Sequence, residues 1–456
     1  MNKTISYNIQ TGYKLALAGA LLTVLTYAVI NNTNFFIAAL PLLIVIPVFL
    51  KKPELPLAVI FNGTFVYFYL TYKMGLYINR TMTGSFYALL VYSFLLAEIV
   101  MLTKGHIRFR ISLVDVLFSA LFLLIFVSYL LFSTNNEIAY KKILYAPMLA
   151  IAPYFGARLL FSITRIKKFL KYSILIPAAL MMPAFYELFH NPLFTQRTRF
   201  SMYMFEDSLS KDNPILFGNM YAILMIIFLV RRLELRKLRL WHLLPLGLCM
   251  YFVLLSGSRG VLVSFVVSMV FYLFVISKIR LKTKFFIISA ILFLSICGYM
   301  LLPENLTKFY QYTISTEARE DSVSSIQMRF TKWDQAIHDI SEHPLMGLGA
   351  GNSDNGLGHP HNIVLESAAE LGIIGLSIFL LLCYAVARKA MKFIKTEESF
   401  VSNMLMKIAF VLFVYSLIHS MFSGIITDQI RLYTSMGLIV CLDNLRLETT
   451  GPQTET

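Results

Sequence analysis

Two histidines beside an apolar segment are the residues of this sequence best suited to proton transfer. His359 and His361 end a long polar stretch, residues 303–362, and a run of apolar residues follows them. An imidazole has an ordinary pKa of about 6.5, so it can take a proton from a hydroxyl group at ambient pH. Pro360 between them and Asn362 after them suit the start of a helix. We predict that this pair contains a general base.

Other interpretations of the pair remain open at this point. A His-x-His pair can bind zinc, but such a site needs further ligands and none lies at a supporting spacing, so we predict no metal site. Histidines at a membrane edge can also be structural. Glu366 and Glu370 follow one helical turn apart, and carboxylates within a membrane are candidates for function. We interpret them first as groups that neutralise a nearby arginine, and only second as catalytic groups.

Three arginines could bind an anion near these residues. Arg199 follows an apolar segment, Arg259 lies in a tight turn at 256–260, and Arg329 lies within the long polar stretch. A guanidinium fork matches phosphate oxygens in a bidentate way, which makes a pyrophosphate group the natural ligand. The alternatives are lipid head groups for Arg199 and a role as an interfacial anchor for Arg259.

Membrane-spanning helices must position these residues. The chain has 456 residues, of which 57% are hydrophobic and 14% charged, and its apolar residues are gathered in long blocks. Uniformly apolar blocks of about 17–23 residues satisfy their backbone hydrogen bonds in a bilayer by forming helices. We therefore predict an all-α, polytopic protein with a single transmembrane domain over residues 1–456 and about 12–14 spans. The predicted spans lie near residues 13–30, 34–50, 55–72, 85–103, 113–132, 143–163, 169–189, 214–230, 240–256, 260–278, 284–302, 363–387, 404–421 and 426–442.

The basic residues indicate how the chain is oriented. Although the net charge is +15, most Lys and Arg residues lie in short connectors on alternate sides of the spans, which disfavours nucleic acid as a partner. That basic side is predicted to be the cytoplasm, so residues 303–362 form a periplasmic loop. Within this loop, residues 325–341 have the spacing of an amphipathic helix, and the glycine-rich residues 343–351 are expected to form a mobile turn. Lys142 departs from the pattern and is interpreted as an interfacial residue.

Several motifs together resemble the O-antigen ligase and O-antigen polymerase superfamily of bacterial inner-membrane proteins. They are Ser256-Gly257-Ser258-Arg259-Gly260, Arg329-x-x-x-Trp333-x-x-Ala336, and His361-Asn362-x-x-Leu365 continuing through Glu370-x-Gly372-x-x-Gly375. The resemblance covers roughly residues 190–440. Within the superfamily, Asn213-Pro214-Ile215-x-x-Gly218 is more similar to the ligase branch.

The resemblance implies an inverting, metal-independent glycosyl transfer without a cofactor. The donor would be a glycan on undecaprenyl pyrophosphate, the acceptor a sugar hydroxyl of lipid A core, and the site the periplasmic face of the inner membrane, in contact with membrane lipids. His361 occupies the family's motif position for the base that accepts the hydroxyl proton. The remaining site residues implied are Arg199, Arg259 and Arg329 at the pyrophosphate, with His359, Asn362, Glu366 and Glu370 in support.

Three alternatives use the same membrane architecture. An O-antigen polymerase would join lipid-linked repeat units, and an O-linked oligosaccharyltransferase would use a protein acceptor. A transporter of lipid-linked glycans would need polar residues through the middle of the membrane, whereas the polar residues here lie mainly outside the spans. The similarity of Asn213-Pro214-Ile215-x-x-Gly218 to the ligase branch makes a ligase the preferred prediction.

Overall fold

The described part of the chain is built from helices that run alongside one another. The computed structural model describes residues 52–63, 110–134, 136–190, 214–304, 320–353 and 359–450, with isolated positions between 66 and 98 and at 306 and 307. Every regular element in these residues is a helix, which confirms the all-α prediction. Seven of the described helices are long and apolar enough to cross a membrane. The first two predicted spans and Arg199 lie outside the described residues.

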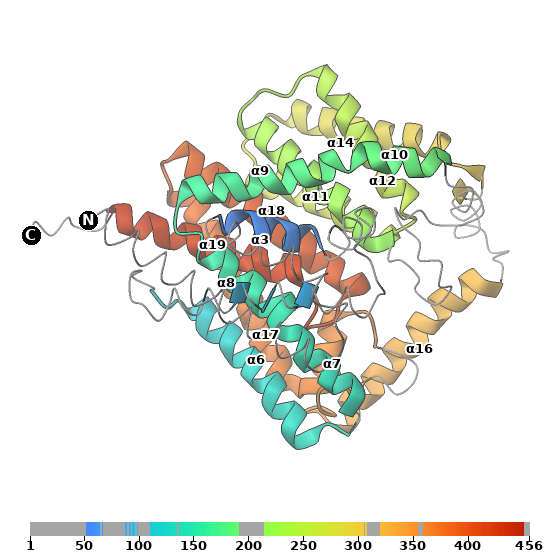
Figure 1. The fold of residues 1–456 in the computed structure, drawn as a ribbon, viewed down its shortest axis with the longest axis vertical. Helices are drawn as coiled ribbons and strands as arrows, with labels where there is room; N and C mark the ends of the chain where they lie inside the picture. Colours follow the sequence, from blue (N-terminus) through green and yellow to red (C-terminus); the bar gives the residue numbers. More distant parts are fainter. Residues whose placement is uncertain are drawn as a thin grey trace, which may run out of the picture.

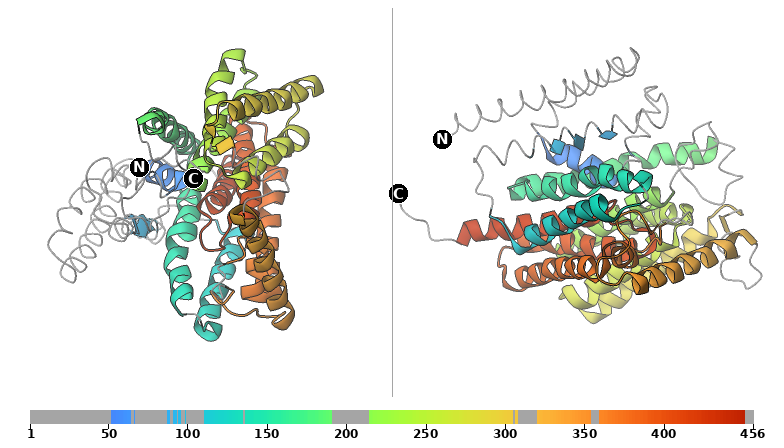
Figure 2. Two further views of the ribbon diagram at one scale, coloured as in Figure 1. Left: turned by 90° about the vertical axis from the view of Figure 1, so that its right-hand side faces the viewer. Right: turned by 90° about the horizontal axis from the view of Figure 1, so that it is seen from below.

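The helices pack around the last three helices of the chain (Figures 1 and 2). Helices α17, α18 and α19 pack on one another; α11 and α13 lie against α18, α6 against α17, and α8 against α19. In chain order the described helices are α3 (Glu54–Asn62), α6 (Leu113–Phe132), α7 (Asn136–Ala146), α8 (Ala152–Arg158), α9 (Ile163–Ala179), α10 (Met181–His190), α11 (Pro214–Glu234), α12 (Leu243–Leu255), α13 (Arg259–Phe271), α14 (Leu281–Met300), α16 (Glu320–Glu342), α17 (Ile363–Thr396), α18 (Phe400–Ser423) and α19 (Ile430–Thr450).

Helix α6 shows how local sequence sets a span. The Ser112 hydroxyl accepts a hydrogen bond from the Asp115 N–H, and the Asp115 carboxylate accepts one from the Ser112 N–H at 2.7 Å. This reciprocal cap satisfies backbone donors that a helix start leaves open. The helix then runs over the predicted residues 113–132, burying Phe118 on one face and leaving Leu123 exposed on the other. An exposed apolar face suits contact with lipid.

The predicted span 143–163 is helical only as far as Arg158, and it is not a regular α-helix. Helix α7 ends at Ala146, a π-helical turn occupies Pro147–Ile151, and α8 follows. Proline cannot donate a backbone hydrogen bond and its ring crowds the preceding turn, so Pro147 and Pro153 interrupt regular α-helix. Lys142, on α7 just before this turn, reaches the buried interior.

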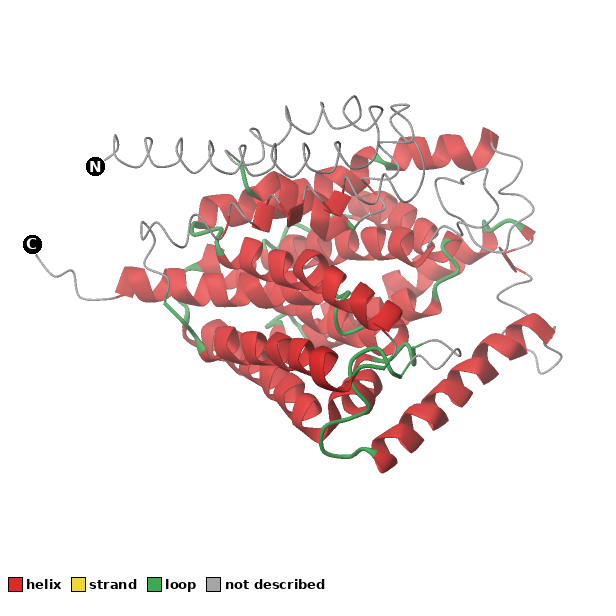
Figure 3. Cartoon of the chain, turned by 60° about the horizontal axis from the view of Figure 1, so that its bottom comes forward, coloured by secondary structure: helices red, strands yellow, loops and turns green. Residues whose placement is uncertain are grey.

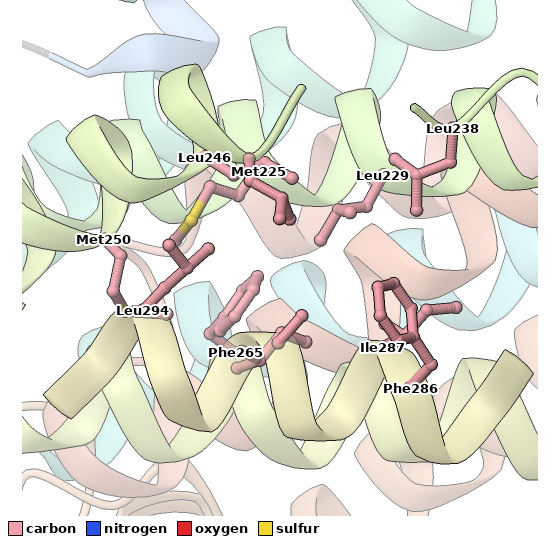
Figure 4. A pocket seen from close by; sticks show the side chains of 12 residues that line it. Met225, Leu229, Leu238, Leu246, Met250, Phe265, Phe286, Ile287 and Leu294 are labelled. Atoms are coloured by element: carbon pink, nitrogen blue, oxygen red, sulfur yellow. The ribbon is translucent and has the colours of Figure 1, made fainter. Parts of the chain in front are cut away.

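The outer helices are less buried than the central ones. In the most apolar window of each helix, 72% of the residues of α11 are buried but only 11% of those of α14. Between α11, α12, α13 and α14 lies an apolar cavity of about 20 Å³, lined by residues such as Leu229, Phe265 and Leu294 (Figure 4). Its size allows about one water molecule, and its lining offers no polar partner, so it is a packing defect rather than a binding site.

Helix α16 lies along the outside of the bundle, slanted relative to the packed spans (Figure 3). It contains the whole of the predicted helical stretch 325–341 and extends beyond it at its start, and it contacts α17. That position brings the long predicted loop to the end of the bundle where α17 begins. The prediction of a helix within the loop is confirmed.

Candidate active site

The start of α17 places the two histidines. The Asn362 side chain accepts hydrogen bonds from the backbone N–H groups of Val364, at 3.0 Å, and Leu365, at 3.3 Å. Asn362 is therefore the N-cap of α17. His361, one residue earlier, has φ 55°, a left-handed conformation that is costly for a residue with a Cβ. The rings of His359 and His361 lie 4.0 Å apart between centroids, so the turn brings both imidazoles together.

Helix α16 is fixed beside this turn. The Trp333 indole N–H donates a hydrogen bond to the Pro360 carbonyl oxygen at 2.9 Å. Trp333 lies one helical turn after Arg329 on α16, so this bond also sets where Arg329 lies relative to the histidines. The two residues of the predicted motif Arg329-x-x-x-Trp333 therefore differ in their contacts. Trp333 anchors α16 to the turn before α17, and Arg329 is exposed and can bind a ligand.

The two histidines differ in their suitability as a base. Burial lowers the pKa of His359 to about 4, and the charges of Lys142 and Lys332 add to this shift. A base with so low a pKa takes a proton from a hydroxyl less readily than an ordinary imidazole does. Of the two predicted candidates, the environment of His359 disfavours it, which supports His361 as the base.

Glu366 and Glu370 meet a lysine rather than the expected arginine. The Lys142 ammonium lies 2.5 Å from a carboxylate oxygen of each, and the three side chains are 6%, 0% and 2% exposed. The interpretation of Lys142 as an interfacial residue is therefore wrong, and so is the expected arginine partner. Burial lowers the pKa of Lys142, but the two carboxylates outweigh it and raise the pKa above its ordinary value, so the lysine is charged. The sequence signal was its departure from the positive-inside pattern, because a cation on that side needs a partner.

Two further donors complete this buried cluster. The Ser353 hydroxyl donates to Glu370 at 2.6 Å, and the Ile426 backbone N–H donates to Glu366 at 2.8 Å. These bonds tie the segment before the histidines and the connector between α18 and α19 to the first turns of α17. Neither residue was predicted, because contacts over such chain distances leave no local pattern. The cluster positions α17, and through it His361.

A break in α17 docks the glycine-rich segment. Gly372 has φ 64° and ψ −166° within the helix, a conformation open essentially to glycine. The freed backbone groups are taken by the segment before it, through Leu348 N–H to Ala369 O at 2.8 Å, Gly349 N–H to Glu370 O at 3.0 Å, and Ile373 N–H to Pro344 O at 2.9 Å. The expectation of a mobile turn over residues 343–351 is therefore wrong. This segment is held to the helix that carries the site.

Two of the three predicted arginines lie near each other. Arg259 is the first residue of α13, directly after a turn in which Gly257 has φ 61°. Loss of hydration lowers the pKa of Arg329, and the charge of Arg259 lowers it further. Two guanidinium groups within reach of each other's charge are unfavourable on their own, and an anion between them would relieve the repulsion. Arg199, the third, lies outside the described residues.

Among the described residues, no three His, Cys, Asp or Glu side chains form a group that could hold a metal ion. The donor atoms gathered at this end of the bundle are instead guanidinium groups and imidazoles, which bind anions and transfer protons. Together these features define a multi-pass membrane protein with a positively charged polar site at one end of its helices.

Comparison with known families agrees with this class. Residues 244–380 match the family model described as O-Antigen ligase. The matched segment contains Arg259, Arg329 and His361. The match supports the O-antigen ligase superfamily, whose motifs the sequence carries, and a function of the O-antigen ligase or polymerase type. The comparison with curated proteins finds no match.

Proposed function

We propose that this protein is an O-antigen ligase of the bacterial inner membrane. It transfers a polysaccharide from undecaprenyl pyrophosphate to a sugar hydroxyl of lipid A core on the periplasmic face. The observation that carries the proposal is the arrangement around Trp333. Its bond to Pro360 holds the helix bearing Arg329 beside His361, and Arg329 in turn lies near Arg259. The matched family segment thus contains the proposed proton acceptor and two of the proposed anion-binding groups.

The reaction needs few groups from the protein. The acceptor oxygen attacks the anomeric carbon as the bond from that carbon to the phosphate oxygen breaks, and attack from the opposite side inverts the configuration. The hydroxyl proton passes to the unprotonated imidazole of His361. The bonding electrons leave with the pyrophosphate, and its growing negative charge is stabilised by Arg259 and Arg329, with Arg199 as a third group.

The buried cluster around Lys142 supports this chemistry indirectly. Two unpaired carboxylates near the start of α17 would repel the leaving pyrophosphate. Lys142 cancels half of that charge while holding Glu366 and Glu370 in place. We assign these residues a positioning role, not a catalytic one.

A transfer assay with purified protein tests the proposal. The donor is a glycan on undecaprenyl pyrophosphate, the acceptor is lipid A core, and a chelator is present throughout. Replacing His361 by Ala removes the base and is expected to slow transfer about 10²- to 10⁴-fold. His359→Gln is the matched control, with a much smaller loss. Both variants should elute as wild type from a sizing column.

Two other outcomes would change the assignment. Full activity in His361→Ala would exclude that residue as the base. If wild type left lipid A core unmodified but elongated lipid-linked repeat units, the protein would be a polymerase that uses the same groups with a different acceptor.

A further inference from the structure

A polar cavity that the proposed chemistry does not use lies between α11, α18 and the start of α19. Its volume is about 140 Å³, much larger than the apolar cavity of about 20 Å³ beside α14. The space is sufficient for several water molecules or for one group of about the size of a sugar ring. The polar side chains that line it include Asn219, Tyr415, His419, Asp428, Gln429 and Arg431.

Arg431 supplies a cation whose hydrogen bonds are incomplete. One terminal nitrogen donates to the Asn62 carbonyl oxygen at 3.2 Å, while its Nε is buried and has no hydrogen-bond partner within the described residues. A buried donor of a charged group is costly to leave unsatisfied. Asp428 lines the same cavity, and its charge and that of Arg431 act on each other without an ion pair between them among the described residues. Both side chains can therefore also bind a group that occupies the space.

The hydrogen bonds around His419 make it a donor. The Tyr415 hydroxyl donates to Asn219 Oδ1, which leaves the amide nitrogen to donate. That nitrogen lies 3.2 Å from His419 Nε2, so Nε2 accepts and the neutral ring carries its proton on Nδ1. His419 lines the cavity, which makes it a candidate donor to a ligand there.

The mixture of groups selects one ligand chemistry. A phosphoryl group would suit Arg431 and His419 but would lie beside the carboxylate of Asp428. A sugar hydroxyl both donates and accepts, so one ring can donate to Asp428 and accept from Arg431 and His419. The separated cation and anion therefore fit a neutral polyhydroxyl ring better than an anion.

The cavity lies between two parts of the candidate active site. The connector after α18 contributes Asp428 to the cavity, and its Ile426 N–H is bonded to Glu366. On the other side, a Cβ placed on Gly260 would lie 2.9 Å from Phe422, next to the lining residue Ser423. A group in this cavity is therefore close both to the turn of Arg259 and to the helix that follows His361.

From this placement we infer that the cavity is a sugar subsite, which binds one uncharged ring of the transferred glycan close to the bond that breaks. The inference rests on the proposed glycosyl transfer, because it assigns a specificity role within the same site. Arg431, Asp428 and His419 would be its main hydrogen-bonding residues.

Binding measurements on the full-length protein in lipid nanodiscs test this subsite. The two probes are the lipid-linked glycan extracted from the source membranes and undecaprenyl pyrophosphate without a sugar. Asp428→Ala and Arg431→Lys are each expected to weaken binding of the glycan-bearing probe about tenfold, which corresponds to about one lost hydrogen bond to a charged group. Binding of the sugar-free probe should stay within twofold of wild type. Lys407→Met, which breaks a charge pair far from the cavity, is the matched control and should change neither.

The outcomes separate this inference from the function on which it rests. An equal loss for both probes would make the cavity a phosphoryl or prenyl site, and unchanged binding of both would remove it from substrate recognition; either result overturns the inference. If the cavity variants discriminate as expected but wild type transfers to no acceptor, the sugar subsite stands and the proposed ligase activity fails. Because Arg431 also contacts the backbone near α3, Asp428→Ala decides the case if Arg431→Lys folds poorly.

Discussion

The two ends of the helix bundle hold their charges in different ways. Away from the candidate site, two of the described lysines each meet one carboxylate. Lys389 pairs with Asp443 and Lys407 with Glu234, and these side chains are 12% to 22% exposed. At the site, Lys142 meets two carboxylates in a fully buried cluster. Each of these one-to-one pairs is partly exposed to water, so its loss should have a modest cost. In the buried cluster, loss of Lys142 would leave two carboxylates without a cation, which should cost much more. The difference indicates that charge at the site end serves positioning as well as stability.

Breaking the cluster should give the largest effect on stability. Lys142→Met leaves two buried carboxylates without their cation, which is expected to lower the free energy of unfolding by about 3–5 kcal/mol. Denaturant titration of the purified protein measures this change. Adding Glu366→Gln and Glu370→Gln to the same variant should recover most of the loss, because no buried charge then remains. A loss of less than about 1 kcal/mol in the single variant would mean that water reaches the cluster.

Substitution at the backbone break in α17 should give the next largest loss of stability. Gly372→Ala forces a residue with a Cβ into φ 64°, and that Cβ would lie 2.2 Å from the Leu345 carbonyl oxygen. The expected loss is about 1–3 kcal/mol, together with slower transfer because the segment that holds α17 must shift. Gly247→Ala, whose added Cβ would meet only the side chain of Leu294 at 3.2 Å, is the control. Equal losses in the two variants would show that the break is not under special constraint.

Removing a charge from the opposite end should cost less. Lys389→Met leaves Asp443 partly exposed to water, so a loss of about 1 kcal/mol in unfolding free energy is expected, with transfer unchanged. The same titration and transfer assay measure both. If this variant were as unstable as Lys142→Met, the contrast between the two ends would be wrong.

A further effect, confined to acidic pH, comes from His359. Its pKa of about 4 lies below the ordinary value of about 6.5, so between these pH values the unfolded chain binds a proton that the folded chain does not. Folding stability should therefore fall as the pH is lowered from about 6.5 to about 4 and should be unaffected above that range. His359→Gln removes this contribution. Melting temperatures should be measured at several pH values for wild type and for the variant. Below about pH 6.5 the melting temperature of wild type should fall more steeply than that of the variant, and above it the two should change in parallel.

The sequence predicted the fold where the determinants are local. Apolar block length predicted α6 over residues 113–132, and the spacing of Arg329 and Trp333 predicted a helix within the long loop. The prediction from sequence failed where proline changes the helix type or where a distant segment sets the backbone conformation. The stretch after Ala146 was predicted as part of one regular span, but a π-helical turn begins at Pro147 and the helix ends at Arg158. Gly372 was recognised as part of a motif, but its left-handed backbone depends on the docked segment around Leu345.

The candidate site was predicted in part for the same reason. His361, Asn362 and Arg259 belong to short motifs, so their local setting could be expected. The partner of Glu366 could not, because Lys142 is 224 residues away and a lysine beside a span resembles an interfacial residue. The polar cavity was also missed, since its lining comes from α11, α18 and α19 and no single stretch of sequence contains its pattern.

The break in α17 should make the positions of the reacting residues independent of the thickness of the bilayer. Membranes differ in hydrocarbon thickness by a few ångströms, and a continuous span responds by tilting. The first turns of α17 are tied instead to the segment around Leu348 and to Lys142, while the long part beyond Gly372 crosses the bilayer. A change of tilt in that long part can be absorbed at the break. The distance from His361 to its neighbours should then persist, so transfer rates are expected to be similar in thin and thick membranes.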